Sequence, residues 1–187
     1  MKHCGTKKIE TERLILRKFV MDDVAAVYNN WANDPEVTKY LTWQTHSNVD
    51  ISSSVLADWT SHYNEPDFYQ WAITLKKNGN EPIGSISVVR KDDRIKMVTI
   101  GYCIGKKWWH KGIMTEALQT LIKFFFEEVG ANRIEAWHDP KNINSGKVMS
   151  KCGMQYEGVH RDADWNNQGI CDVAMYAILA NSYSPEN

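Results

Sequence analysis

The 187-residue sequence lacks long apolar runs, an excess of one charge and closely spaced cysteines. No stretch approaches the ~20 apolar residues of a membrane span, and residues 1–8 have no apolar core of signal-peptide type. A formal net charge of -1, with both signs interspersed, gives neither a nucleic-acid footprint nor a polybasic membrane segment. We therefore expect a cytoplasmic protein that makes no direct contact with nucleic acid or membrane.

The 4 cysteines are scattered, with no Cys-x-x-Cys pair and no export signal, so reduced thiols are expected. Cys103 and Cys171 lie in strand-like runs, where a cysteine usually acts as a small hydrophobe. The histidines and acidic residues show no paired spacing of metal ligands. We expect no metal.

The chain contains no repeat, low-complexity tract or linker, and its length suits one domain over residues 1–187. Residues 1–8 are expected to form a flexible N-terminal segment. Hydrophobic periodicity predicts strands over 13–17, 69–75, 83–89, 97–104, 133–138, 156–161 and 170–179. It predicts helices over 24–31, behind Asp22 as N-cap, and over 51–63, 115–129 and 145–151.

The segment from Ile104 to Ala117 is the most informative, because a strand ends there in a basic turn that opens directly into a helix. Unsatisfied N–H groups at a helix start attract anions, and Gly112 lets the backbone approach a ligand closely. Neither a Walker loop nor a three-glycine dinucleotide loop is present. The turn therefore predicts a phosphate or pyrophosphate site to which Lys106, Lys107 and Lys111 add charge.

The same turn resembles the acetyl-coenzyme A (acetyl-CoA) loop of the GNAT superfamily of N-acetyltransferases, Gln/Arg-x-x-Gly-x-Gly/Ala. The frame here reads Trp109-His110-Lys111-Gly112-Ile113-Met114. Its Trp-x-Lys-Gly-x-x-Thr-Glu-Ala form is similar to the Rim-type branch, which acetylates the N-termini of ribosomal proteins. Three further segments resemble that branch: 9–17, 33–41, and Asn144-Ser145 with 151–154.

The resemblance implies an α+β fold with three α/β/α layers. A mixed, mostly antiparallel sheet of about seven strands would splay between its fourth and fifth strands, 97–104 and 133–138, and about four helices would cover it. Acetyl-CoA would lie in that opening as co-substrate. The residues that the resemblance assigns to acetyl-CoA are Cys103, Ile104, Trp109, His110, Lys111, Gly112, Ile113, Met114, Thr115 and Asn144.

Acetyl transfer to an amine needs a neutral nucleophile and a proton for the departing thiolate. Many GNAT enzymes use a tyrosine acid where this chain has Met149, and the resemblance implies Ser145 instead. Thr99 stands where the branch often has a glutamate base, which leaves Glu135 or His138 as candidates for a weak base.

Without a strong base, the acceptor's own pKa decides how much of it is neutral. An α-amine with a pKa near ~8 is roughly a tenth neutral at pH 7, against about one lysine in 2,500. The sequence therefore favours a protein N-terminal α-amine, with Tyr40 and Trp43 as residues of the acceptor cleft. A small-molecule amine such as an antibiotic or polyamine remains an alternative acceptor, and so does a non-catalytic acyl-CoA-binding module. The chain would act as a monomer or homodimer.

Overall fold

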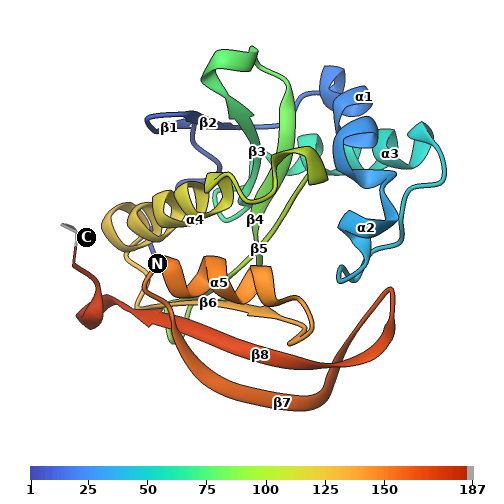
Figure 1. Cartoon of the computed structure of the whole chain (residues 1–187). Coiled ribbons are helices and arrows are strands. Elements are labelled where there is room, and N and C mark those ends of the chain that lie inside the picture. The colour runs from blue at the N-terminus through green and yellow to red at the C-terminus, as the bar shows by residue number, and fades with distance from the viewer. Residues whose placement is uncertain (185–187) are drawn as a thin grey trace.

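A computed structural model describes residues 1–184, so the last three residues of the expected domain lie outside it. Its centre is one mixed sheet in the order β1-β2-β3-β4-β5-β6-β8-β7 (Figure 1). All neighbouring strands pair antiparallel except β5 and β6, which are parallel. The strands are β1 Ile9–Glu10, β2 Leu14–Arg17, β3 Gln70–Leu75, β4 Pro82–Asp92, β5 Met97–Ile104, β6 Arg133–His138, β7 Gln155–Asn166 and β8 Gly169–Leu179.

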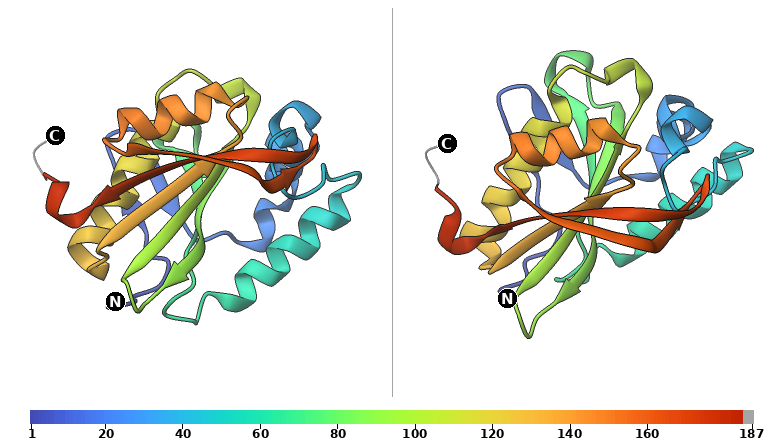
Figure 2. Two further views of the ribbon diagram at one scale, coloured as in Figure 1. Left: turned by 90° about the horizontal axis from the view of Figure 1, so that it is seen from below. Right: turned by 60° about the horizontal axis from the view of Figure 1, so that its bottom comes forward.

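Helices cover both faces of the sheet, with α4 and α5 on one face and α1 and α3 on the other (Figure 2). Their bounds are α1 Val24–Val27, α2 Pro35–Thr38, α3 Val49–His62, α4 Ile113–Phe124 and α5 Ile143–Lys151. The predicted α+β fold with three layers is confirmed. The sheet has eight strands instead of about seven, because the two-residue strand β1 is too short to show periodicity.

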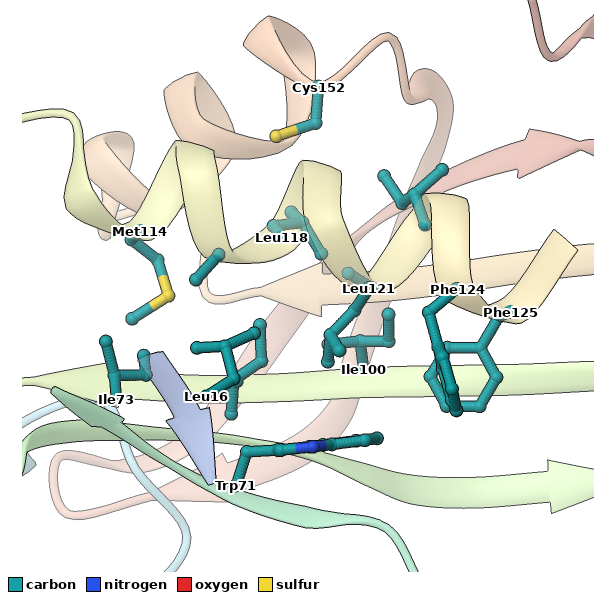
Figure 3. Close-up of a cluster of buried hydrophobic side chains, with 14 of the residues drawn as sticks. Leu16, Trp71, Ile73, Ile100, Met114, Leu118, Leu121, Phe124, Phe125 and Cys152 are labelled. Atoms are coloured by element: carbon teal, nitrogen blue, oxygen red, sulfur yellow. The ribbon is translucent and has the colours of Figure 1, made fainter. Parts of the chain in front are cut away.

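The main core forms where the apolar stripe of α4 packs on the sheet (Figure 3). Met114, Leu118 and Leu121 recur at helical spacing and are buried against side chains of the central strands. The helical segment continues through a wider turn over Phe125–Val129 and ends at Gly130, whose φ of 73° is the left-handed conformation expected of a C-cap glycine. This core fixes the N-terminus of α4 relative to β5.

Residues 1–8, which the sequence predicted to be flexible, run along the edge of the core in this structure. The Lys2 amide donates to the Val129 carbonyl (2.8 Å), and the Trp71 indole donates to the Lys7 carbonyl (2.6 Å). Thr6 is buried and bonds both Phe68 and Gln70 through its hydroxyl. Hydrogen bonds thus join this segment to β3 and to the helical turn over Phe125–Val129.

The expected N-cap at Asp22 is wrong. Asp23 makes the bonds that begin this helical segment: its carboxylate accepts from the Val20 amide (2.9 Å) and pairs with both terminal nitrogens of Arg17 (2.7 and 2.8 Å). Asp23 is buried, whereas Asp22 is exposed. The sequence alone does not distinguish two adjacent aspartates as the residue that begins the helix. The ion pair with Arg17 selects Asp23.

Candidate active site

The sheet opens between β5 and β6. The two strands pair only at Met97 with Arg133, Val98 with Ile134 and Thr99 with Glu135, and no further pair forms between them in the described chain. A bulge near Val89 in β4 adds local twist beside this point, and Gly101 leaves room for the Val89 side chain. The backbone of β5 beyond Thr99 therefore has a free edge toward β6.

A cavity of about 500 Å³ occupies this opening. The ends of β5 and β6 and the start of α5 form one side, and the segment 40–46 together with the β7–β8 hairpin tip forms the other. Its lining includes Tyr40, Trp43, His46, Tyr102, Cys103, His138, Asp139, Asn142, Ser145, Asp164 and Trp165. One continuous space thus joins the strand opening to an aromatic pocket.

The predicted anion turn has the geometry that the sequence implied. Gly112 adopts a φ of 71° and precedes α4, and no side chain caps the first turn of that helix. The Trp109 indole donates to the Ile104 carbonyl (2.8 Å) and so ties the turn to the end of β5. The side chains of Ile113 and Met114 are buried in the core, so only their backbone can reach a ligand.

Arg13, which the sequence interpretation placed only in a strand, supports this turn. Its guanidinium donates to the Lys111 carbonyl (2.9 Å) and to Glu116 (2.6 Å) in the first turn of α4. Lys106 is paired with Glu36 (2.5 Å), whereas Lys111 has no ion pair among the described residues. The exposed charge at the turn therefore comes from Lys107 and Lys111.

Ser145 meets a phenol that the sequence interpretation missed. Its Oγ lies 3.0 Å from the Tyr102 hydroxyl, and both residues line the cavity. Burial raises the pKa of Tyr102, so the phenol stays protonated at neutral pH. Met149 is 1% exposed and packs in the core, where it offers no proton. The hydroxyl pair is thus the proton-bearing group at the start of α5.

The hairpin tip closes the far side of the cavity. The Asn167 side-chain amide donates to the carbonyls of Thr38 (2.9 Å) and Trp43 (2.8 Å), and its backbone amide donates to Leu41 (3.2 Å). The strands β7 and β8 are long enough to carry this tip across to the region of α2 (Figure 1). Tyr40 and Trp43 line the resulting pocket, and their contact with an acceptor stays a prediction.

A family model described as "Acetyltransferase (GNAT) domain" matches residues 13–155, a range that includes the strand opening and the uncapped helix start. The chain belongs to the GNAT acetyltransferase family. It is 32% identical over 174 residues to the uncharacterized N-acetyltransferase p20 of Bacillus licheniformis, which covers 93% of this chain and 97% of that protein.

Two further comparisons support the assignment. An 86-residue region is 38% identical to the ribosomal protein uS5-alanine N-acetyltransferase of Escherichia coli K12, covering 46% of this chain and 44% of that protein. The solved GNAT acetyltransferase of Bacillus anthracis shares 27% identity at a TM-score of 0.82, covering 94% of this chain and 99% of that chain. The resemblance found in the sequence is confirmed, and the chain is an acetyl-CoA-dependent N-acetyltransferase.

Asn142, and not the predicted Asn144, lines the cavity. Asn142 is at the N-cap position of α5, and no capping bond uses its side chain. Asn144 is exposed and lies outside the lining. Asn142 precedes Ser145 by three residues, the helical spacing that places two side chains on one face, whereas Asn144 points about 100° away. That spacing was visible in the sequence.

Glu135, one candidate base, does not reach the cavity. Its carboxylate accepts from Arg133 (2.6 Å), which also pairs with Glu157 on β7 (2.9 Å). Glu135 is absent from the cavity lining, and Thr99, opposite it on β5, is fully buried. The Arg133 ion pairs therefore link β6 to β7 outside the cavity.

His138 lines the cavity, but one ring nitrogen is hydrogen-bonded and the other is enclosed. Its Nδ1–H donates to the Asp139 carbonyl (2.7 Å), and Nε2 is buried without a partner. A Cβ at Gly146 would lie 2.6 Å from that Nε2, so the nitrogen faces the backbone of α5. Burial lowers the pKa of His138 and keeps the ring neutral.

No group of three or more histidine, cysteine, aspartate or glutamate side chains that could hold a metal ion occurs within residues 1–184. No helix within the same range is long and apolar enough to cross a membrane.

Proposed function

We propose that the chain transfers the acetyl group of acetyl-CoA to the α-amine at the N-terminus of a protein. The main support for this proposal is that the hairpin tip covers the acceptor pocket, where Asn167 bonds the segment 38–43. Because the pocket is covered there, we expect an acceptor to enter it end first, as a chain terminus does. The Escherichia coli relative, named as an N-acetyltransferase for an alanine of ribosomal protein uS5, supports the same acceptor class.

The cofactor end of the site fits acetyl-CoA. The uncapped amides at the start of α4, the left-handed Gly112 and the exposed Lys107 and Lys111 suit a pyrophosphate. The free edge of β5 at Cys103 and Ile104 suits the amides of a pantetheine arm. Asn142 would hold that arm from the side of α5. Bound there, acetyl-CoA supplies the activated thioester.

The Ser145–Tyr102 pair would act on the leaving sulfur. The Ser145 hydroxyl is already held in place by the Tyr102 hydroxyl. It can therefore donate a hydrogen bond to the developing thiolate without the reorganisation that solvent water would need. Both hydroxyls keep their protons at neutral pH, so they stabilise the thiolate by donating hydrogen bonds to it, and the thiolate takes its own proton from solvent as it leaves. Cys103 does not compete as a nucleophile, because burial raises the pKa of its thiol.

One observation favours a second acceptor class, a small cationic amine. Asp139 and Asp164 line the cavity, neither is in an ion pair within the described chain, and no lysine or arginine belongs to the lining. A diamine could place its second ammonium between these carboxylates. Asp139 also anchors the hairpin by accepting from Asn166 (2.9 Å), so part of its charge serves the fold.

A matched acceptor panel tests the proposal. One peptide with a free α-amine and no lysine, its Nα-blocked twin with one lysine, and a linear diamine are each offered at equal concentration while thiol release is measured. We expect the first peptide to react at least about 100-fold faster than the second, since the neutral fractions of the two amines differ about 250-fold at pH 7. Preferential reaction of the diamine would favour the second class, and preferential reaction of the lysine would refute the proposal.

A further inference from the structure

The acetyl transfer proposed above needs a group that takes a proton from the acceptor nitrogen, and the expected positions do not supply one. Thr99 cannot act as a base, Glu135 is held by Arg133 outside the cavity, and both nitrogens of His138 are engaged or enclosed. A base must therefore be sought among the other cavity residues.

His46 is the other imidazole in the cavity, on the side of the acceptor pocket. The residue is 8% exposed and lines the cavity. Its Nδ1 lies 2.7 Å from Ser52 Oγ, its amide donates to the Ala32 carbonyl (2.9 Å), and its ring packs 5.3 Å from that of Trp43. Three contacts thus fix the ring against α3 and the end of the α1 segment.

The second nitrogen of this ring is available. No hydrogen bond to His46 Nε2 forms within the described chain, and this nitrogen is not enclosed as that of His138 is. When Nδ1–H donates to Ser52, the neutral ring carries its lone pair on Nε2, at the wall of the acceptor pocket. Ser52 is fully buried in the first turn of α3, and in this tautomer its Oγ accepts from Nδ1–H.

We propose that His46 is the general base of the reaction and that Ser52 is the residue that positions it; this inference rests on the proposed function. As the acceptor nitrogen bonds to the acetyl carbon and the carbon–sulfur bond breaks, the nitrogen's proton passes to His46 Nε2. The imidazolium then releases that proton to solvent, and the departing thiolate, held by hydrogen bonds from the Ser145–Tyr102 pair, takes one proton from solvent. Amine and acetyl-CoA thus yield amide and thiol with no net change in protons.

The surroundings of His46 keep it in the base form. Burial lowers its pKa below the usual 6.5, so it is neutral at pH 7. The titratable groups that share the cavity are the carboxylates Asp139 and Asp164, His138, two phenols and two thiols: Tyr40, Tyr102, Cys103 and Cys171. The faces of α1 and α3 toward the cavity contribute only Val27, Val55 and Trp59 to its lining, which do not titrate.

The test is the pH dependence of kcat/KM between pH 5 and 9 for the best acceptor of the panel, whichever class that is. In wild type, both the acceptor and His46 must be neutral, so log kcat/KM rises with slope 2 below the pKa of His46. It then rises with slope 1 up to the pKa of the acceptor amine, which is about 8 for an α-amine and about 10.4 for a lysine. His46→Gln should lower kcat at pH 7 about 100-fold, leave acetyl-CoA affinity unchanged and give slope 1 at every pH below the acceptor pKa.

Control variants separate chemistry from structure. His62→Gln, at the half-exposed end of α3 and outside the cavity lining, should behave as wild type. Ser52→Ala should lower kcat less than His46→Gln does and keep the slope of 2, since the imidazole remains. If His46→Gln fails to fold, His46→Ala assayed with added imidazole replaces it, and recovery of activity with imidazole is expected.

The proposal is overturned if His46→Gln keeps the slope of 2, or if His138→Gln is the variant that removes it. It is also overturned if His46→Ala is not restored by imidazole while it still binds acetyl-CoA. Failure of the N-terminal acceptor proposal would look different: the panel would then favour the diamine or the lysine, and the slope test would still apply to that acceptor.

Discussion

Replacing Gly112 by tryptophan should abolish tight acetyl-CoA binding while leaving a folded protein. At φ 71° a side chain costs about 1–2 kcal/mol of folding free energy, and a Cβ there would meet only Arg13 Nη2, at 3.5 Å. The indole would, however, occupy the space that a pyrophosphate needs in order to reach the amides of α4. Losing two charge-assisted hydrogen bonds, at about 1.5–3 kcal/mol each, weakens binding by about 10²- to 10⁴-fold.

Gly130→Trp is the matched control for this change. Gly130 has nearly the same φ, 73°, with nothing within 4 Å of a built Cβ, and it lies at the opposite end of the same helical segment. Both variants should lose similar stability in thermal unfolding, and calorimetry should show lost acetyl-CoA affinity only for Gly112→Trp. Equal affinity in the two variants would refute the placement of the pyrophosphate at this turn.

Three further predictions concern catalysis and stability. Ser145→Ala should lower kcat about 100-fold and Tyr102→Phe about 10-fold with little change in acetyl-CoA affinity, as steady-state kinetics and calorimetry would show; a larger loss in affinity than in kcat would contradict the assigned role. Trp71→Ala empties a fully buried site beside Phe124 and Phe125 and should cost about 3–5 kcal/mol of unfolding free energy in urea titrations. Gly105→Ala would place a Cβ 2.2 Å from the Asn30 carbonyl oxygen, and the same titration should show a loss of about 1–3 kcal/mol.

The sequence predicted the parts of this fold that depend on local periodicity. The stripe of Leu118 and Leu121 defined α4, and Gly130 was recognised as its end because left-handed backbone there favours glycine. The anion turn before α4 was equally visible, since it depends on a helix start and a glycine adjacent in the chain. The boundary at Asp23 was missed because it depends on Arg17, which lies six residues away.

The candidate site was predictable only where its residues are neighbours in the sequence. Ser145 lies at the cavity as expected, but its partner Tyr102 is 43 positions away on another element. Arg13 supports the turn from 98 positions away. Nothing in the sequence around His46 indicates that its ring lines the acceptor pocket, because the burial and the Ser52 bond arise only when α3 packs against the sheet.

The most direct test of the account uses one peptide that carries both a free N-terminal α-amine and an internal lysine. After incubation with acetyl-CoA and the purified chain at pH 7, tandem mass spectrometry locates the acetyl group. We predict a single acetyl group on the α-nitrogen. Acetylation of the lysine instead, or an unmodified peptide in the presence of a chain that binds acetyl-CoA and acetylates a diamine, would contradict the proposed N-terminal specificity.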